Sequence, residues 1–547
     1  MPNAARSTWG QVLAACAVCL VALAVVLATR GSSSAPAAAP RPALASMFQD
    51  DDHLLYASDA IVTSSLDRLR QLGVNQIRAT VLWKNLAPAP TATTRPAGFR
   101  ALEPGAYPAG AWAPYDRLVK QARARGITVD FDVSAPGPLW AMAPGAPSAT
   151  YADHWSPAAK GFGHFVAAVG ARYSGHYVPP GASAPLPRVS FWSVWNEPNQ
   201  QGWLAPQWKG VGGQRVMESA ALYRTYVDAA FSALAQTGHT PASDTILVGE
   251  LAPEGSVQPK YDYRDPISPL SFLRGLYCVD SSYRPLAGAA ATAIGCPAAG
   301  GAAGFAAAHP ALFQATGFGH HPYSFFLAPS TSMSDTSFAP LADLGRLEQE
   351  LDALFRTYGV ARTLPLYLTE YGYETYPPNP WRGVSLRLQS LYLNEAEYMA
   401  WRDPRVRTMS QFLLYDARPD SRYPAGSQKY WSTFQTGLRF AQGQPKPSYY
   451  SYRLPVFLPD PVIGSSGTVL VWGMIRAAPA GTRQQAQIQW RTQNGSSYQT
   501  LTAVTPENAS QVFAVPVHVP GPGVIRLAWT SPTGRVLYSR GAGVRLG

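Results

Sequence analysis

The fold is decided by residues 191–199, Phe-Trp-Ser-Val-Trp-Asn-Glu-Pro-Asn. The apolar first half of this stretch predicts a short buried strand, and Pro198 prevents further strand pairing. A carboxylic acid, Glu197, therefore stands at the carboxyl end of a strand. In a (β/α)₈ barrel functional side chains collect at that end, because the loops there form an open bowl above a packed core. We therefore predict that this strand belongs to such a barrel.

A second stretch of the same kind lies further along the chain. Residues 364–372, Leu-Pro-Leu-Tyr-Leu-Thr-Glu-Tyr-Gly, form another apolar run that ends in an acid, Glu370, with Gly372 placed to turn the chain. Two more apolar runs, residues 245–251 and 317–323, separate the acids. The order predicts barrel strands four, five, six and seven, with acids at the ends of the fourth and the seventh.

The two acidic motifs together resemble those of clan A of the retaining β-glycosidases. Trp-Asn-Glu-Pro-Asn resembles the acid/base motif of glycoside hydrolase family 39, with family 5 similar, and the motif ending in Glu370 resembles the nucleophile motif. The resemblance implies that Glu370 attacks the anomeric carbon, while Glu197, kept protonated by its surroundings, protonates the leaving oxygen. Asn196 is then expected to bind the sugar 2-hydroxyl. No metal or organic cofactor is implied.

Further site residues follow from the same resemblance. Arg78, in a predicted second strand, matches the arginine beside the nucleophile, and an interior salt bridge is the plainer interpretation. His321 and Tyr323 resemble the family 5 pattern in which the tyrosine hydroxyl bonds the nucleophile; a paired-histidine metal site is the alternative. Trp140 and Trp203, in predicted loops, are expected to stack against sugar rings. Many clan A enzymes have a tryptophan at the end of the eighth strand, and Tyr415 or Trp431 is expected to take its place here.

Other acids have less certain roles in the sequence. Glu250 ends the predicted fifth strand and is a rival for the catalytic pair, but it lacks the motif context. Asp130 and Asp132 share one face of the predicted third strand, which is either the barrel interior or the side facing the helices. The run from Asp50 to Asp52 suggests a calcium site, a solvated strand end or a substrate-facing loop, with the last two favoured.

Composition is consistent with a carbohydrate-active protein of more than one domain. The chain has 547 residues, and its 15 Trp and 28 Tyr exceed what packing alone usually requires. Rings of this kind serve as platforms for the apolar faces of sugars. The net charge of +11 comes from basic residues scattered without runs, so no nucleic-acid partner is expected.

The N-terminus predicts export. An apolar run from Val12 to Ala28 has a length between that of a signal segment and that of a spanning helix, so residues 1–30 are a signal peptide or a single membrane anchor. Residues 31–45 are an Ala/Pro/Ser linker. The exported part is secreted or anchored to the outer face of the cytoplasmic membrane. There Cys278 and Cys296 are expected to form a disulfide.

The remaining pattern divides the exported part in two. Residues 46–455 are predicted to form the (β/α)₈ barrel, an α/β fold, with other strands at 47–56, 74–83, 126–134 and 408–415. Predicted helices include 64–72, 115–125, 158–173 and 346–358. Short alternating segments in residues 456–547 predict a C-terminal β-sandwich, which either binds polysaccharide or packs against the barrel, with packing slightly favoured.

The expected activity is therefore retaining hydrolysis of a β-glycoside in a polysaccharide or oligosaccharide. The motifs do not specify the sugar. The alternatives are a transglycosylase with the same site and a non-catalytic, cell-surface polysaccharide-binding protein that kept the barrel. A binding protein has no need of two acids, which favours the enzyme.

Overall fold

The computed structural model describes residues 43–298, 301–479, 481–508 and 510–547, and residues 43–547 form one compact unit. The predictions for residues 1–30 and for most of the linker lie outside the described residues. Among the helices described, none is long and apolar enough to cross a membrane. The division into a barrel domain at 46–455 and a second domain at 456–547 stays a prediction.

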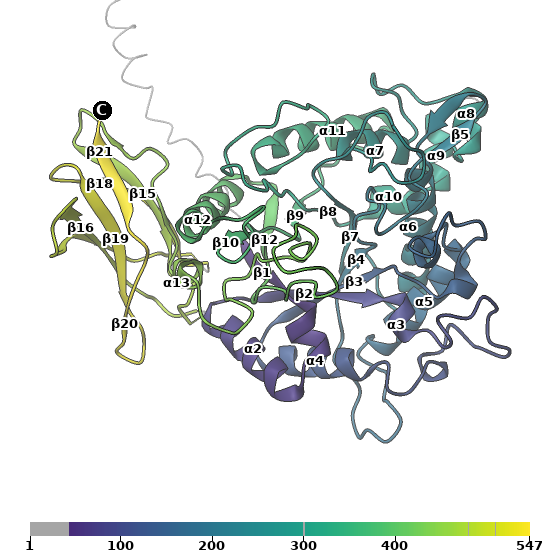
Figure 1. Ribbon diagram of the computed structural model, residues 1–547, viewed down its shortest axis with the longest axis horizontal. Coiled ribbons are helices and arrows are strands. Elements are labelled where there is room, and N and C mark those ends of the chain that lie inside the picture. Colours follow the sequence, from purple (N-terminus) through teal and green to yellow (C-terminus); the bar gives the residue numbers. More distant parts are fainter. Residues whose placement is uncertain (1–42, 299–300, 480, 509) are drawn as a thin grey trace, which may run out of the picture. The chain divides into compact units, whose positions relative to one another are not determined.

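Eight parallel strands close into a barrel, which confirms the predicted (β/α)₈ fold. Figure 1 shows the helices arranged around these strands. Around the barrel the order is β1-β12-β9-β8-β7-β4-β3-β2. The strand bounds are β1 (Ala45–Gln49), β2 (Gln76–Leu82), β3 (Thr128–Ser134), β4 (Phe191–Val194), β7 (Thr245–Leu251), β8 (Gly317–His320), β9 (Leu366–Leu368) and β12 (Val406–Phe412).

The helices that cover the barrel follow the predicted periodicity. In α11, apolar side chains at 347, 351, 354 and 355 are buried. The α2 helix ends just before Gly73, whose φ of 82° is readily adopted only by glycine. The longer helices are α2 (Asp59–Gln71), α4 (Ala113–Ala124), α5 (Ala159–Arg172), α6 (Glu218–Gln236), α11 (Leu344–Thr357) and α12 (Leu386–Arg402); α13 (Pro447–Arg453) closes the barrel region.

Long loops on the carboxyl side of the strands carry shorter elements. The segment after β7 contains several short helices, and Cys278 and Cys296 form the expected disulfide there. The short elements are α3 (Trp83–Leu86), α7 (Pro269–Leu276), α8 (Gly288–Ala293), α9 (Ala302–Ala308), α10 (Pro310–Gln314) and the strand pairs β5 (Lys209–Val211) with β6 (Gln214–Val216) and β10 (Thr375–Tyr376) with β11 (Val384–Ser385).

Three barrel strands end earlier than the sequence predicted. The sixth was expected to reach residue 323, but β8 stops at His320. The first was expected to reach residue 56, but β1 stops at Gln49 and residues 52–56 form a π-helical turn. The Asp50 carboxylate, directly after β1, accepts hydrogen bonds from the backbone N–H groups of Leu414 and Tyr415. The eighth was expected to reach residue 415, but β12 stops at Phe412.

The interior of the barrel is apolar at one end and polar further along its axis. At the amino end of the strands Met47, Phe191 and Leu247 form a small apolar cluster with Tyr367 packed against it. Above it the inward positions are polar and buried, and they include both aspartates of β3, Asp130 and Asp132. The open question about β3 is thus answered: its aspartates face the barrel interior and not the helices.

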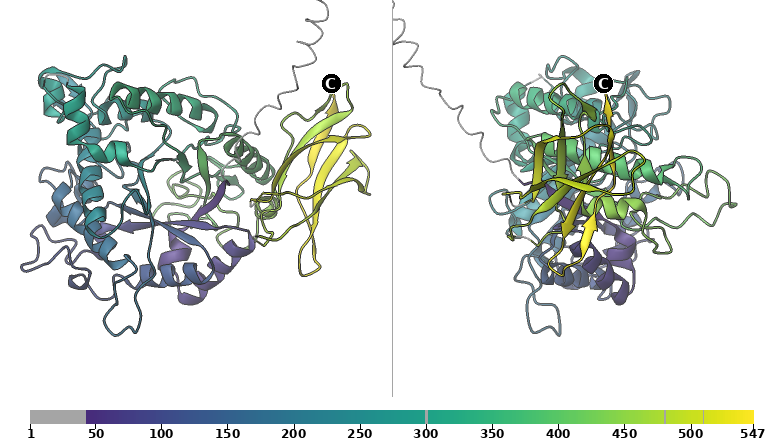
Figure 2. Two further views of the ribbon diagram at one scale, coloured as in Figure 1. Left: turned by 180° about the vertical axis from the view of Figure 1, so that it is seen from behind. Right: turned by 90° about the vertical axis from the view of Figure 1, so that its left-hand side faces the viewer.

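The C-terminal segment forms two sheets beside α12 and α13 (Figures 1 and 2). One has the order β13-β15-β18, the other β14-β21-β19-β16-β17 with β20 paired to β19. Their inner side chains share one hydrophobic core. The bounds are β13 (Val456–Phe457), β14 (Val462–Ile463), β15 (Thr468–Met474), β16 (Ala486–Thr492), β17 (Gln499–Val504), β18 (Val512–His518), β19 (Gly523–Thr530), β20 (Val536–Tyr538) and β21 (Ala542–Leu546).

Candidate active site

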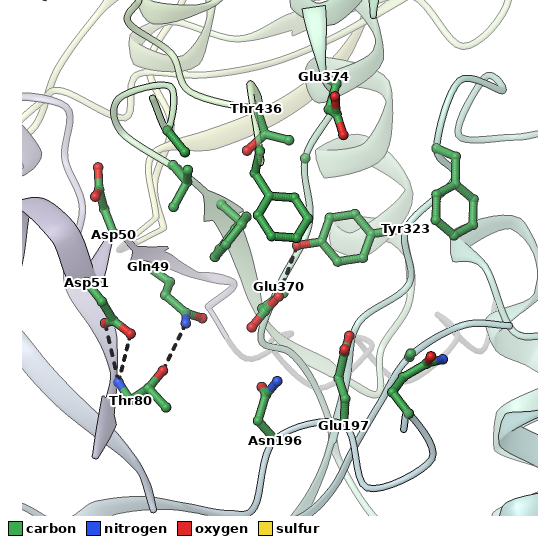
Figure 3. A pocket seen from close by; sticks show the side chains of 18 of the residues that line it. Gln49, Asp50, Asp51, Thr80, Asn196, Glu197, Tyr323, Glu370, Glu374 and Thr436 are labelled. Carbon is green, nitrogen blue, oxygen red and sulfur yellow. Dashed lines mark hydrogen bonds between the residues drawn. The ribbon is translucent and has the colours of Figure 1, made fainter. Parts of the chain in front are cut away.

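A cavity of about 740 Å³ opens at the carboxyl end of the barrel strands. Glu197, just after β4, and Glu370, just after β9, both line it. One carboxylate oxygen of each lies within 4.8 Å of the other. Nδ1 of His321 lies 2.9 Å from Glu197 and 3.8 Å from Glu370. The two acids that the sequence singled out, 173 positions apart in the chain, therefore face one small space (Figure 3).

Glu370 is held by a cation and a hydroxyl group. The Arg78 guanidinium donates to Oε1 of Glu370 at 2.7 Å, and the Tyr323 hydroxyl donates to Oε2 at 3.0 Å. Burial and the charge of Glu370 raise the pKa of Tyr323 well above its usual value, so the tyrosine stays a neutral donor. These contacts hold the Glu370 carboxylate in one orientation. Arg78 and Tyr323 lie where the sequence predicted.

Arg78 joins several of the predicted site residues. Its side chain is fully buried, and besides Glu370 it donates to Oδ1 of Asn196 at 2.7 Å and to Oε2 of Glu250 at 3.1 Å. Asp132 lies 3.2 Å from the same guanidinium. One planar fork with several N–H donors can satisfy such a group of acceptors, whereas a point charge cannot. Arg78 thus orients both Glu370 and Asn196.

Glu197 has a different neighbourhood. Its side chain is 19% exposed, and its Oε1 lies 2.9 Å from Nδ1 of His321. Burial disfavours a charge on His321, but Glu370 and hydrogen bonds to Glu197 and Glu250 outweigh it and raise the pKa of His321 to about 10. The protonated ring therefore donates to Glu197 from one nitrogen and to Glu250 from the other, at 3.0 Å. The neighbour of Glu197 is thus a charged group and not an apolar pocket.

The backbone at Glu197 is strained. Trp195 has φ of 68° and Glu197 has φ of 39°, a region that residues with a β-carbon rarely occupy. The Glu197 N–H donates to the carbonyl of Glu250 at 3.0 Å, and the Trp195 ring stacks on Tyr226. Packing and hydrogen bonds therefore hold a conformation that turns the Glu197 side chain toward the cavity.

Glu250, the rival acid, has a supporting position. It is fully buried and does not line the cavity. Burial raises its pKa, but Arg78 and His321 outweigh burial and lower the pKa to about 2. Thr369 also donates to Glu250, at 2.6 Å. Glu250 is thus a permanent counter-charge that fixes Arg78 and His321.

The aromatic residues expected as sugar platforms separate into two groups. Trp203 lines the cavity. Trp140 donates its indole N–H to the carbonyl of Pro88, Tyr415 stacks on His53, and Trp431 packs on Tyr430; these three do not line the cavity. For Trp140 the structure favours the role of a loop anchor. The aromatic ring at the end of the eighth barrel strand that does reach the cavity is Phe412.

Several cavity residues were not identified from the sequence. Gln49 and Thr80 lie on the side of the cavity next to β1 and β2, and the Gln49 amide donates to the Thr80 hydroxyl (Figure 3). Asp51 accepts the Thr80 N–H, and burial raises the pKa of Asp51 to about 7. The run of acids at 50–52 was the available signal, and all three acids line the cavity.

Glu197, His321 and Glu370 also have the spacing of a candidate metal site. A metal would need a lone pair on His321, but its two ring nitrogens lie 2.9 Å from Glu197 and 3.0 Å from Glu250 and so already share protons with carboxylates. The donor set therefore suits a proton-sharing network better than a cation.

No family model matches the chain, and the search of curated proteins found no match. Solved structures that it resembles include a glucosidase from Croceicoccus marinus, with 14% identity over 88% of this chain and 87% of that one and a TM-score of 0.42. A family 1 β-glucosidase from Thermotoga maritima has 13% identity, coverage of 71% and 84%, and a TM-score of 0.41. A GH5_18 protein from Bifidobacterium longum subsp. infantis has 14% identity over 75% of this chain and 78% of that one, with a TM-score of 0.42.

Proposed function

We propose that this protein is a retaining β-glycoside hydrolase. The observation that carries the proposal is the approach of Glu197 and Glu370 to within 4.8 Å across a cavity at the carboxyl end of a barrel. Retaining enzymes place their two carboxyl groups about 5–5.5 Å apart, whereas inverting enzymes need about 6.5–9.5 Å to admit a water molecule. The separation here supports double displacement.

In the first step Glu370 is the nucleophile. Its ionised oxygen bonds to the anomeric carbon as the glycosidic bond breaks, and Glu197 gives its proton to the leaving oxygen. Arg78 and Tyr323 hold Glu370 in one orientation, which lowers the entropy cost of the attack. Asn196, whose Oδ1 accepts a hydrogen bond from Arg78, then binds the sugar 2-hydroxyl.

In the second step water releases the sugar. Glu197, now a carboxylate, takes a proton from the water while the oxygen attacks the anomeric carbon and Glu370 leaves. Protonated His321 donates to Oε1 of Glu197 and so stabilises the carboxylate that forms when Glu197 gives up its proton. No step needs a metal or an organic cofactor. The same intermediate passed to a sugar hydroxyl would give transglycosylation.

We also propose that the protein is exported and that its two C-terminal sheets form a β-sandwich. The disulfide between Cys278 and Cys296 supports an oxidising compartment. The apolar run at residues 12–28 supports a signal segment or an anchor on the outer face of the membrane. Two sheets that share one core are the arrangement of a sandwich.

The test uses a panel of 4-nitrophenyl β-glycosides of glucose, galactose, xylose and mannose. We expect hydrolysis of at least one, retention of anomeric configuration by NMR, and a loss of at least about 10³-fold in kcat for Glu370→Gln. Glu103→Gln, with a 54% exposed side chain that does not line the cavity, is the control. Inversion of configuration, or unchanged hydrolysis by Glu370→Gln, would overturn the mechanism. Sugar binding without any hydrolysis would favour the binding protein.

A further inference from the structure

The cavity has two chemically different sides. The loop after β1 lines one side with Asp50, Asp51 and Asp52. Phe325 and Phe326 in the loop after β8 and Trp381 in the loop after β9 also line the cavity, as do Phe412 of β12 and Phe434. Acids are not confined to the β1 side, because Glu254 and Glu374 line the cavity from the loops after β7 and β9. A substrate that fills the cavity therefore meets the three aspartates next to β1 and the exposed rings of the loops after β8 and β9 across from them.

The position of the proton donor shows which end receives the leaving group. Figure 3 shows Asp50 and Asp51 on one side of Glu370 and Glu197 on the opposite side. The leaving oxygen must lie against Glu197, so the leaving group extends away from the aspartates. In that direction stand the loops after β4, β7 and β8, the last of which carries Phe325 and Phe326.

The loop after β9 also reaches this side. Arg382 is close enough to lower the pKa of Glu254, which burial raises, and Glu254 belongs to the loop after β7. Trp381, the neighbour of Arg382, lines the same cavity as Phe325 and Phe326. Some polar groups on this side of the cavity hydrogen-bond each other: the Gln200 side-chain amide donates to the backbone carbonyl of Glu254.

The rings on this side are unusually exposed for their size. Phe326 is 67% exposed, Trp381 55% and Phe325 38%, and all three line the cavity. Phenylalanine offers no hydrogen-bonding group, whereas sugar sites combine rings with polar groups that bind hydroxyls. Burying such rings against an apolar group removes both surfaces from water, which is favourable.

We propose that the group released by this protein is apolar, so that its substrates are β-glycosides of an alkyl or aryl aglycone and not chains of sugars. The proposal rests on the glycosidase function given above. The acidic side then holds the sugar, and Phe325, Phe326 and Trp381 cover the aglycone. Each methylene group buried against the rings should raise kcat/KM about fourfold until the aromatic surface is covered.

The experiment compares methyl and n-octyl β-glycosides of glucose, galactose and xylose with cellobiose, lactose and xylobiose. We expect kcat/KM for at least one octyl glycoside to exceed that of its methyl counterpart and of the matching disaccharide by about 50-fold or more. If no octyl glycoside is preferred, the proposal fails. The 4-nitrophenyl assay with Glu370→Gln tests the glycosidase function separately, so the two failures are distinguishable.

Variants identify the surface involved. Phe326→Ala should lower the octyl-to-methyl ratio of kcat/KM about tenfold, and Phe326→Leu should lose less because it keeps apolar area. Trp381→Ala should act in the same direction. Tyr538→Ala, which removes a 44% exposed ring from β20, should leave the ratio unchanged. An octyl preference that survives both Phe326→Ala and Trp381→Ala would place the aglycone elsewhere and overturn the assignment.

Discussion

At the scale of single residues, the candidate centre is ordered by two buried cations. Arg78 and His321 lie between Glu197, Glu250 and Glu370, and each cation contacts at least two of the acids. Taking one partner out of such a network leaves a buried charge without compensation, which typically costs about 3–5 kcal/mol. Geometry and charge therefore have to be tested by different substitutions.

Arg78→Lys tests geometry, because it keeps the charge and loses the planar fork. A lysine ammonium cannot hold Glu370 and Asn196 in their observed positions at once. We expect kcat on the best aryl glycoside to fall about 10²-fold while the circular dichroism spectrum stays native. Arg100→Lys, at a largely exposed position, is the control. A kcat within threefold of wild type would show that Arg78 does not position the nucleophile.

His321→Gln tests charge through the pH dependence of stability. The pKa of His321 is raised to about 10, so between pH 6.5 and 10 the folded protein keeps a proton that the unfolded chain loses. The stabilisation is complete below about pH 6.5 and declines as the pH rises through 10. We expect the free energy of unfolding of wild type to fall across this range by at most about 1.4 kcal/mol per pH unit from this group.

The measurement is urea denaturation at several pH values from 6 to 10. His321→Gln should be less stable at pH 6 and should show a flatter dependence on pH than wild type. His176→Gln removes an exposed histidine and should leave the slope unchanged. Parallel curves for wild type and His321→Gln would contradict the raised pKa.

At the scale of the elements, the barrel makes space for Glu250 by using glycine on the neighbouring strand. The β7 and β8 strands shift register between Gly249 and Leu251, so that the Glu250 side chain enters the barrel. A β-carbon at Gly319 in β8 would lie 2.0 Å from Oε1 of Glu250. The carboxylate is held by Arg78 and His321 and is not free to retreat.

Gly319→Ala should therefore destabilise the protein and disturb the site. We expect a loss of about 1–3 kcal/mol of unfolding free energy by urea denaturation, together with reduced kcat. Gly345→Ala is a matched control, because that glycine lies in α11 with open space around its missing β-carbon. The control should be neutral or stabilising by up to about 1 kcal/mol. Equal effects of the two substitutions would show that Glu250 can move.

At the scale of the whole molecule, the C-terminal sheets are joined to the barrel by buried contacts. Arg476, just after β15, forms a buried ion pair with Glu397 of α12 and donates to the carbonyl of Tyr452 at 2.8 Å. Trp472 of β15 packs edge-on against Tyr398 of α12. This arrangement favours the role in packing that the sequence suggested, and it predicts that barrel and sheets unfold together.

Glu397→Gln should weaken that junction. Removing one charge from a buried pair leaves Arg476 uncompensated, and we expect a loss of about 3–5 kcal/mol with a lower Tm for a single calorimetric transition. Glu507→Gln changes an 86% exposed side chain and should stay within about 0.5 kcal/mol of wild type. Two separate transitions in wild type would show instead that the sheets fold independently.

The sequence alone determined the eight barrel strands, the two principal acids and their chain order. Apolar runs that end in acids are local patterns, and parallel strands of a barrel bring all their carboxyl ends to one face. Arg78, His321 and Tyr323 were found through a resemblance. Arg78 and Tyr323 contact Glu370 as it implied, whereas it did not specify the contact between His321 and Glu197.

Only the tertiary structure decided what each remaining residue contacts. The register of β3 decides that Asp132 faces the barrel interior. The bulge in β7 decides the position of Glu250, and the path of its loop keeps Trp140 away from the cavity. Those features are set by contacts between segments far apart in the chain. A sequence pattern describes which residues neighbour each other along the chain, whereas charge pairing and the shape of a cavity arise across it.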